Sequence, residues 1–272
     1  MTVFGQLVIG PPGAGKTTYC DGMQQMMHQL KRDMVVVNLD PGNDAVPYEV
    51  AIDIRELISV EDVMEEYNLG PNGSLIYCME YIVENLDWLK KEFDSKCKGK
   101  YVIFDMPGQV ELYTHHESLR ELCEALRNWD CRLCAVHLVD SVLCTDPHKF
   151  VSSVWISLAA MMQLELPHVN VLSKVDILKT HHQDLDFRLE HYLDVSNLKH
   201  LSQAMYKDNH PLNKQFVKFN EEMCEVMEDY GLVGFVPLDI QDKEATMQVL
   251  VKCDQSNGRL FGSIKNIFNF VF

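Results

Sequence analysis

Long apolar segments are missing from this sequence of 272 residues. Its most apolar runs, such as 35–37 and 169–172, are far shorter than the roughly 20 residues of a membrane-spanning helix. The first ten residues, MTVFGQLVIG, have no basic residue before their apolar part, whereas a secretion signal would have one. We therefore expect no membrane contact and a location in the cytoplasm or the nucleus.

An excess of positive charge is also missing. Lysine and arginine together number 24 against 40 aspartates and glutamates, so the formal net charge is −16. Tight nonspecific binding to nucleic acid requires a basic surface that displaces counterions from the phosphates. The composition therefore argues against direct nucleic-acid binding and favours basic protein partners.

The cysteines lack the pattern of a disulfide-stabilised protein. There are nine, an odd number, at irregular spacings, which is typical of reduced thiols inside a cell. Cys131 and Cys134 form a CxxC motif in a stretch that resembles a strand, where an offset of three puts two side chains on opposite faces. We expect two buried thiols; zinc binding, which needs two more ligands, is the less favoured alternative.

Short β-branched runs alternate with amphipathic stretches along the chain. Continuous apolar strands joined by helical crossovers form a parallel sheet that helices cover on both faces. The sequence therefore predicts one α/β domain over residues 1–272, with a mostly parallel six-stranded sheet and a polar, helical insertion at about 178–232. The expected strands are Phe4–Ile9, Met34–Leu39, Tyr101–Asp105, Leu133–Val139, Val169–Leu172 and Phe235–Leu238.

The stretch NLGPNGSLIY separates two helical patterns. Before it, Ser59 and Asp62 have the spacing of a capping box that opens a helix; after it, apolar residues recur at helical spacing from Leu75 to Leu89. Glycine, proline and asparagine preset a tight, exposed turn at 70–73. Pro71 adds a stiffness that a simple reversal does not need.

A phosphate-binding loop follows the first expected strand. GPPGAGKTT satisfies the pattern G-x4-G-K-[ST] between a strand and a helix. The backbone N–H groups of such a loop hold the β-phosphate, Lys16 reaches the β and γ oxygens, and the Thr17 hydroxyl binds Mg²⁺. The residues expected to contact nucleotide here are Gly10, Pro11, Pro12, Gly13, Ala14, Gly15, Lys16, Thr17 and Thr18.

The third expected strand ends in Asp105 and continues as MPGQVE. In P-loop nucleotide hydrolases, an acidic residue at that strand end holds Mg²⁺ through water, and an amide at the position of Gly108 contacts the γ-phosphate. Gln109 is placed to orient the attacking water. We expect Asp105 to be a metal ligand and Gln109 to be catalytic.

Threonine is absent from Tyr19 to Tyr113. The threonine that closes over Mg²⁺ in Ras-like GTPases therefore has no equivalent here. Asp40, at the end of the second expected strand in NLDPGND, offers a carboxylate beside the phosphates instead. We expect Asp40 to bind Mg²⁺ through water or to accept a proton from the nucleophile; a turn-capping role, common for Asp-Pro-Gly, is the alternative.

The fifth expected strand ends in SKVD. Guanine presents two adjacent N–H donors that a carboxylate accepts together, so Asp176 is expected to select guanine while the Lys174 stem covers the base. Asparagine is the usual first residue of this motif. Ser173 stands in its place, so the sequence departs from the motif at the residue associated with the contact to the N7 atom of guanine.

In this order and spacing, GPPGAGKTTYC, NLDPGND, LGPNG, DMPGQVEL and SKVD resemble the motifs of the GPN-loop GTPases over nearly the whole chain. YCMEYIVENLDWL, HLVDS, CTDPHKF and FVPLDIQDKE are most similar to the second eukaryotic paralogue of that family. The resemblance implies a P-loop GTPase of the SIMIBI class that binds GTP or GDP with Mg²⁺. Gly42, where alanine is usual, and Ser173 depart from the pattern.

The resemblance also implies partners. It identifies Gly70, Pro71 and Asn72 as the loop that crosses a dimer interface, where Asn72 would serve catalysis at the partner's nucleotide. The dimer would be a homodimer or a heterodimer with another GPN-loop GTPase. The family's role in RNA polymerase II assembly and nuclear import implies contact with polymerase subunits or assembly factors and shuttling to the nucleus.

Two other functions are compatible with the same fold. One is a binding module that holds nucleotide with negligible turnover, which the presence of Gln109 disfavours. The other is a P-loop kinase, which usually needs arginines that close over the phosphates. The expected insertion contains only Arg188.

Overall fold

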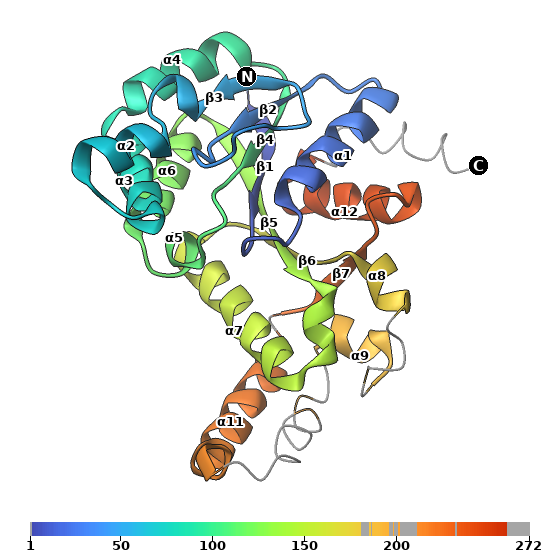
Figure 1. The fold of residues 1–272 in the computed structure, drawn as a ribbon. Coiled ribbons are helices and arrows are strands. Elements are labelled where there is room, and N and C mark those ends of the chain that lie inside the picture. The colour runs from blue at the N-terminus through green and yellow to red at the C-terminus, as the bar shows by residue number, and fades with distance from the viewer. Residues whose placement is uncertain are drawn as a thin grey trace.

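The computed structural model describes residues 2–180, 185, 187–195, 198, 201, 211–231 and 233–259. One sheet of seven strands runs through it in the order β3-β2-β4-β1-β5-β6-β7, and every neighbouring pair is parallel (Figure 1). The strands are β1 Val3–Ile9, β2 Met34–Asn38, β3 Val50–Asp53, β4 Tyr101–Asp105, β5 Cys131–Asp140, β6 His168–Ser173 and β7 Phe235–Leu238.

The strand that the sequence did not predict is β3, so the expectation of six strands was wrong. It has four residues and lies at the sheet edge beside β2. The register of its pairing with β2 shifts between Val36 and Val37 of β2. Only Ile52 of this strand is fully buried. A strand this short, with half-exposed residues, lacks the continuous apolar run that identified the central strands.

Helices cover both faces of the sheet, as the sequence predicted (Figure 1). In the described residues, α1 and α12 lie on one face, and α3, α4 and α6 lie on the other. The helices are α1 Lys16–Gln29, α2 Val60–Tyr67, α3 Pro71–Glu84, α4 Leu86–Lys96, α5 Val110–Thr114, α6 Glu117–Asn128, α7 Pro147–Leu164, α8 Val175–Thr180, α9 Leu189–Leu193, α11 Pro211–Tyr230 and α12 Lys243–Ser256, with short 3₁₀ turns η1 Ile54–Glu56 and η2 Ser141–Thr145.

Separate apolar cores fill the two sides of the sheet. Met79 of α3 and Leu119 of α6 belong to one core, and Met23 of α1 belongs to the other. Cys131 lies in the first core and Cys134 in the second, and both are buried. The two thiols therefore point to opposite faces, as the strand periodicity predicted.

The hairpin of α2 and α3, called the GPN hairpin below, differs in one respect from the prediction. Ser59 caps α2 by accepting a hydrogen bond from the Asp62 N–H at 3.2 Å, as expected. The reversal itself occurs at Asn68, whose φ of 54° ends α2. Pro71 then begins α3, so Gly70–Gly73 is not a free turn: Gly70 is the N-cap and the next residues are the first helical turn. Proline suits this position because its missing N–H is not needed there.

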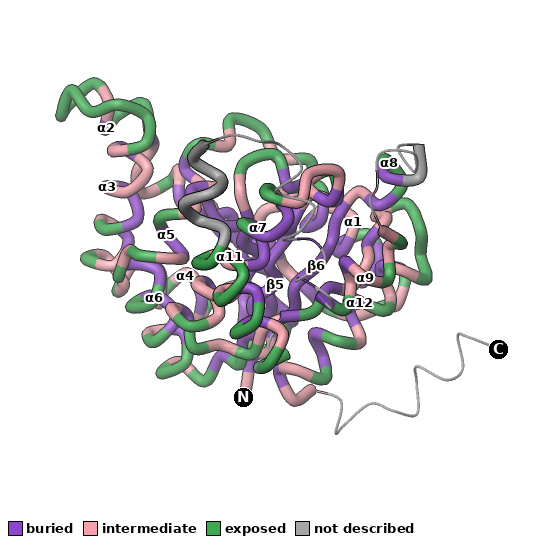
Figure 2. The backbone as a smooth tube through the Cα atoms, turned by 90° about the horizontal axis from the view of Figure 1, so that it is seen from below, coloured by how far each residue is buried: buried purple, intermediate pink, exposed green. Residues whose placement is uncertain are grey.

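The apolar stripe after the turn spans two helices, since α3 ends and α4 begins around Asn85. Figure 2 shows the GPN hairpin extending from the edge of the molecule, with mostly exposed residues near its tip.

Between β6 and β7 the described residues form α8, α9 and α11. Residues 181–184, 186, 196–197, 199–200, 202–210 and 232 of the expected insertion lie outside the described residues, so its extent stays a prediction. Within the part of the chain that the structure describes, none of the helices has the length and apolar character needed to cross a bilayer.

Candidate nucleotide-binding site

The phosphate loop, residues 10–17, joins β1 to α1 at the centre of the sheet's carboxyl edge. Gly10 has a φ of +146°, and a Cβ there would lie 2.5 Å from the carbonyl oxygen of Leu138. Gly15 caps α1 with a left-handed φ of +94°. Both positions require glycine, and they aim the free N–H groups of the α1 N-terminus into one cradle suited to an anion.

Lys16 lies inside this cradle. Its side chain is buried and Nζ donates to the Pro11 carbonyl at 3.3 Å. A Cβ on Gly108 would be 2.9 Å from this Nζ and 3.2 Å from the backbone nitrogen of Pro12. The loop after β4 is therefore packed directly on the phosphate loop. Burial lowers the pKa of Lys16, against the opposing effect of Asp105 and Asp40.

Asp105 is fully buried at the end of β4. Its Oδ2 accepts a hydrogen bond from the Tyr48 hydroxyl at 2.8 Å, while its Oδ1 is buried without a protein partner. Burial raises the pKa of Asp105 to about 6, although the Tyr48 hydroxyl favours the ionised form. A buried carboxylate oxygen without a partner is a position that a cation would stabilise.

Asp40 lies two residues beyond β2 and begins the segment 40–48, called the Asp40 loop below. Its Oδ1 accepts the Gly42 N–H at 3.0 Å, and its own N–H donates to Asn38 at 3.2 Å. Burial raises the pKa of Asp40, against the Gly42 hydrogen bond and the charge of Lys16. Asp40 both caps its own turn and interacts with Lys16. A role beside the phosphates and a turn-capping role are therefore compatible.

The oxygen atoms of Thr17, Asp40 and Asp105 are the hard ligands that Mg²⁺ prefers. Asp40 and Asp105 both act electrostatically on Lys16, and Thr17 is its neighbour in the chain. Together with the partnerless Oδ1 of Asp105, this donor set fits the expected magnesium ion.

Gln109 is buried at the N-cap of α5, with 8% of its surface exposed. Neither its amide oxygen nor its amide nitrogen has a protein hydrogen-bond partner. A buried amide without partners costs about 1–3 kcal/mol. This cost at the residue after Gly108 is consistent with a group whose partner is a substrate or water.

Of the residues expected near the guanine base, two are bonded to the phosphate loop and one is exposed. The Ser173 hydroxyl lies 2.8 Å from the Ala14 carbonyl and 3.1 Å from that of Val139, so it ties β6 to the phosphate loop. Lys174 has a φ of 58° and its Nζ donates to the Gly13 carbonyl and to Asp140, each at 2.6 Å. Asp176 is exposed in the first turn of α8.

Comparisons with known proteins agree with these motifs. Residues 8–259 match the family described as "Conserved hypothetical ATP binding protein". The chain is 51% identical over 264 residues to GPN-loop GTPase 2 of Danio rerio, covering 96% of this chain and 83% of that protein. It is 49% identical over 263 residues to GPN-loop GTPase QQT1 of Arabidopsis thaliana, covering 96% and 87%.

This chain belongs to the GPN-loop GTPase family.

A solved structure supports the fold. The apo form of a GTPase from Pyrococcus abyssi superimposes with a TM-score of 0.75 at 24% identity, covering 93% of this chain and 97% of that one. The α/β P-loop fold predicted from the sequence is thus confirmed, with seven strands in place of six.

The residues that name the GPN-loop family are on the molecular surface. Gly70, Pro71 and Asn72 are all exposed at the start of α3. Among the described residues, none of the phosphate-loop side chains hydrogen-bonds to Asn72. The nucleotide site of this chain therefore does not bring Asn72 together with Lys16, Asp105 and Gln109.

Four residues at the site were missed by the sequence analysis. Tyr48 and Asn43 come from the Asp40 loop, where Tyr48 contacts Asp105 and the Asn43 amide lies 3.4 Å from the Thr17 hydroxyl. Asp53 and Arg55 come from β3 and η1. The sequence Asp-Ile-Arg after a short β-branched run could have indicated Asp53 and Arg55, but only if β3 had been recognised as a strand.

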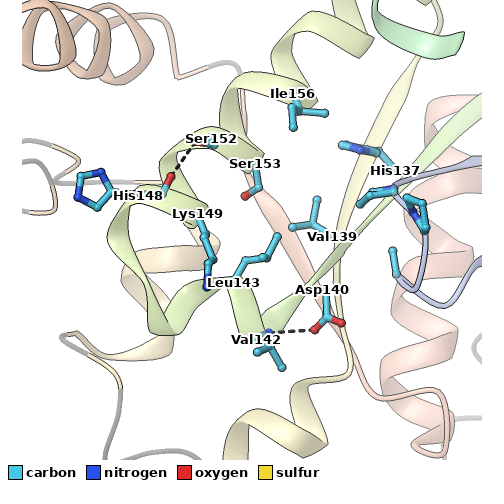
Figure 3. A pocket seen from close by; sticks show the side chains of 13 residues that line it. His137, Val139, Asp140, Val142, Leu143, His148, Lys149, Ser152, Ser153 and Ile156 are labelled. Atoms are coloured by element: carbon cyan, nitrogen blue, oxygen red, sulfur yellow. Dashed lines mark hydrogen bonds between the residues drawn. The ribbon is translucent and has the colours of Figure 1, made fainter. Parts of the chain in front are cut away.

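A hollow of about 520 Å³ adjoins the phosphate loop on the α7 side (Figure 3). Pro11, Pro12 and Ala14 form its border with the loop, and Figure 3 shows Val139, Leu143 and Ile156 around it. Its lining includes neither Lys16 nor Asp176. This hollow therefore borders the expected nucleotide position and shares Pro11, Pro12 and Ala14 with it.

Proposed function

We propose that this chain is a Mg²⁺-dependent GTPase that works as a dimeric switch. The observation that carries the proposal is the contact between the loop after β4 and the phosphate loop, where Gly108 packs on Lys16. This packing assembles a lysine, two carboxylates and a buried amide around one anion cradle. Such a combination suits a triphosphate better than a monophosphate.

The phosphate loop binds the β-phosphate through backbone N–H groups, and Lys16 places its charge between the β and γ oxygens. Because Lys16 is buried and faces Asp40 and Asp105, it stays close to the cradle before nucleotide arrives. Thr17, Asp40 and Asp105 would hold Mg²⁺, which neutralises developing charge on the phosphates when bound. Tyr48 orients Asp105 for this role.

Gln109 and Asp40 act on the water that attacks the γ-phosphate. The partnerless Gln109 amide can donate to and accept from one water, which orients that water for attack. Asp40 has a pKa raised by burial and is suited to accept a proton. Turnover, and not only binding, is favoured because a buried amide without partners would be costly in a purely structural module.

Guanine selectivity is assigned to Asp176, whose exposed carboxylate can accept both N–H groups of the guanine edge. Lys174 and Ser173 position this end of the site, since both are hydrogen-bonded to the phosphate loop. Ser173 thereby performs a tethering role that does not require a contact with the N7 atom of the base.

The dimer is either a homodimer or a heterodimer with another GPN-loop GTPase. The exposed Gly70, Pro71 and Asn72 support this part of the proposal, since they are presented outward on a preset helix start. Family membership is the support for RNA polymerase II subunits or assembly factors as partners. It is also the support for shuttling between cytoplasm and nucleus.

Competition binding and single-turnover hydrolysis test the proposal directly. GTP, ATP and xanthosine triphosphate are compared with Mg²⁺, for the unmodified chain, Asp176→Asn and the exposed control Asp87→Asn. We expect preference for GTP, a shift towards xanthosine triphosphate in Asp176→Asn, and no shift in the control. Equal binding of ATP and GTP would refute the base assignment. Tight GTP binding without phosphate release by any assembly would favour a binding module.

A further inference from the structure

We infer that Asn43 is a positioning residue for the magnesium site and that the Asp53–Arg55 pair holds it in place. The inference rests on the proposed binding of GTP and Mg²⁺ and assigns residues that this binding alone does not require. It answers a question raised by the sequence, which has no threonine between Tyr19 and Tyr113 to contact the magnesium side of the nucleotide.

The first observation is the position of the Asn43 side chain. Its Nδ2 donates to the Thr17 hydroxyl oxygen over 3.4 Å. A hydroxyl oxygen has two lone pairs, so this contact uses one and leaves the other for a cation. Asn43 therefore contributes to the orientation of the Thr17 hydroxyl, which also interacts with Asp105, without adding a negative charge.

The second observation is that the backbone of Asn43 is clamped. Arg55 Nη1 donates to the carbonyl oxygen of Asn43 at 2.6 Å and to that of Asp44 at 2.8 Å. The same guanidinium donates to both carboxylate oxygens of Asp53, from Nε at 3.0 and 3.1 Å and from Nη2 at 2.6 Å. A planar guanidinium can make these bonds together, and a lysine cannot.

The clamp is connected to the rest of the site. Asp53 Oδ1 accepts from Asn38 Nδ2 at 3.1 Å, and Asn38 Oδ1 accepts the N–H of Asp40. Asp53 and Arg55 thus reach the start of the Asp40 loop through Asn38 and its middle through Asn43. Tyr48 fixes the end of the same loop on Asp105.

These contacts give the Asp40 loop a fixed shape with Asp40 and Asn43 on the nucleotide side. Asn43 is the uncharged polar group that the loop delivers to Thr17, so it supports the magnesium side of the site through Thr17 and is not itself a magnesium ligand. The effect of Asn43 is expected only when Mg²⁺ is bound. Without the metal, the phosphate loop alone holds the nucleotide, and the orientation of the metal ligand Thr17 matters little.

The test measures dissociation of a fluorescent GDP in saturating Mg²⁺ and again in excess EDTA. We compare the unmodified chain, Asn43→Ala and Asn128→Ala, whose asparagine is exposed at the end of α6. We expect Asn43→Ala to release GDP about 3- to 10-fold faster in Mg²⁺, the size of one modest hydrogen bond. In EDTA we expect the same rate as the unmodified chain, since a general loss of structure would change both rates.

The clamp is tested by Arg55→Lys and Arg55→Met, with Arg120→Met as the exposed control. Thermal unfolding first checks that each variant is folded. We expect Arg55→Met to repeat the Mg²⁺-specific effect and Arg55→Lys to show part of it. In the double variant with Asn43→Ala the two effects should not add, because both act through one contact.

The outcomes separate this inference from the function on which it rests. If GDP release from the unmodified chain does not depend on Mg²⁺, the magnesium part of the proposed function is wrong. If release from the unmodified chain is slowed by Mg²⁺ and Asn43→Ala is slowed equally, the role of Asn43 is refuted. Additive effects of Asn43→Ala and Arg55→Met would refute the clamp.

Discussion

The phosphate-loop region and the tip of the GPN hairpin carry the two most specific sequence signatures and differ in their surroundings. Lys16, Asp105 and Gln109 are buried close to the ends of the neighbouring strands β1 and β4. Gly70, Pro71 and Asn72 are exposed. The phosphate-loop region is formed within a single chain. The hairpin tip is stiffened by Pro71 and presents Asn72 to solvent.

The difference agrees with our proposal that one region binds a ligand and the other a partner chain. A buried polar cradle is stabilised by a ligand that enters it, whereas a preset surface loop loses little entropy when it inserts into another molecule. The two regions are also in contact at their bases: a Cβ on Gly42 would lie 3.6 Å from Leu75 of α3 and 4.0 Å from Val60 of α2. A change at the Asp40 loop can therefore reach the GPN hairpin through packing.

The largest effect is expected from Lys16→Ala, which breaks the assembled region. It removes a charge-assisted contact worth about 1.5–3 kcal/mol, so GTP affinity should fall by about 10- to 150-fold or more while the domain stays folded. Calorimetric titration with GTP measures this. Lys91→Ala, at an exposed position of α4, is the control. Unchanged GTP binding by a folded Lys16→Ala chain would show that the site is elsewhere.

Asn72→Ala breaks the exposed region and should leave GTP affinity unchanged. If Asn72 acts on a partner's nucleotide, hydrolysis by the dimer should fall by about 10²-fold, the usual effect of losing one oriented donor. Multiple-turnover phosphate release at high protein concentration measures this, and Asn128→Ala serves as the control. Equal losses of binding and turnover would instead place Asn72 in its own chain's phosphate site.

The free energy of unfolding is expected to depend on pH through His137. This residue is fully buried in β5, with Nδ1 3.0 Å from the Ser157 hydroxyl, and burial lowers its pKa from 6.5 to about 4. The unfolded chain therefore binds the proton first as pH falls, so its contribution to stability is complete above pH 6.5 and is lost towards pH 4. Between pH 7 and 5 the loss is about 2 kcal/mol.

Urea denaturation over this pH range measures the loss. His137→Asn keeps a polar partner for Ser157 and does not titrate, so its stability should change less with pH. His168, with a pKa lowered to about 3 by burial and by His137, contributes a further decline in both proteins. The same pH slope in both proteins would contradict the assignment to His137.

The smallest effect is expected where the two regions meet. Gly42 does not have a left-handed φ, and an added Cβ would make ordinary contacts of 3.4–4.0 Å. Gly42→Ala should therefore stabilise the fold by about 0.4–1 kcal/mol by restricting the unfolded chain. Chemical denaturation measures it, with Gly10→Ala as the opposite case because of its φ and its clash with Leu138. Destabilisation by Gly42→Ala would show that the contact with Leu75 is tighter than described.

Continuous signals allowed the sequence to predict the central part of the fold. The strands around β1 are mostly apolar and buried, and the phosphate loop combines a motif with its flanking elements, so both were predicted. β3 was missed because only Ile52 of its four residues is fully buried. The start of α3 at Pro71 was taken for a turn because glycine and proline favour both a turn and a helix N-terminus.

The missed site residues share one physical cause. Tyr48, Asn43 and Arg55 act through contacts with residues distant in sequence, such as the hydrogen bond from Tyr48 to Asp105. No local spacing encodes such pairs, since they arise only when β3 pairs with β2 and the Asp40 loop folds against Thr17 and Asp105. Asp40, Asp105 and Gln109 could be proposed from the sequence because they lie at or shortly after the ends of β2 and β4, which are neighbours in the sheet.

The central claim is that Asn72, at the exposed tip of the GPN hairpin, completes the nucleotide site of a partner chain. Mixing two inactive variants tests this claim most directly. An Asn72→Ala chain keeps its nucleotide site, and a Lys16→Ala chain keeps its Asn72. In a 1:1 mixture, we predict GTP hydrolysis well above that of either variant alone, because mixed dimers pair one intact site with one intact Asn72. If mixed dimers form and hydrolysis does not exceed that of Asn72→Ala alone, Asn72 does not act across the interface.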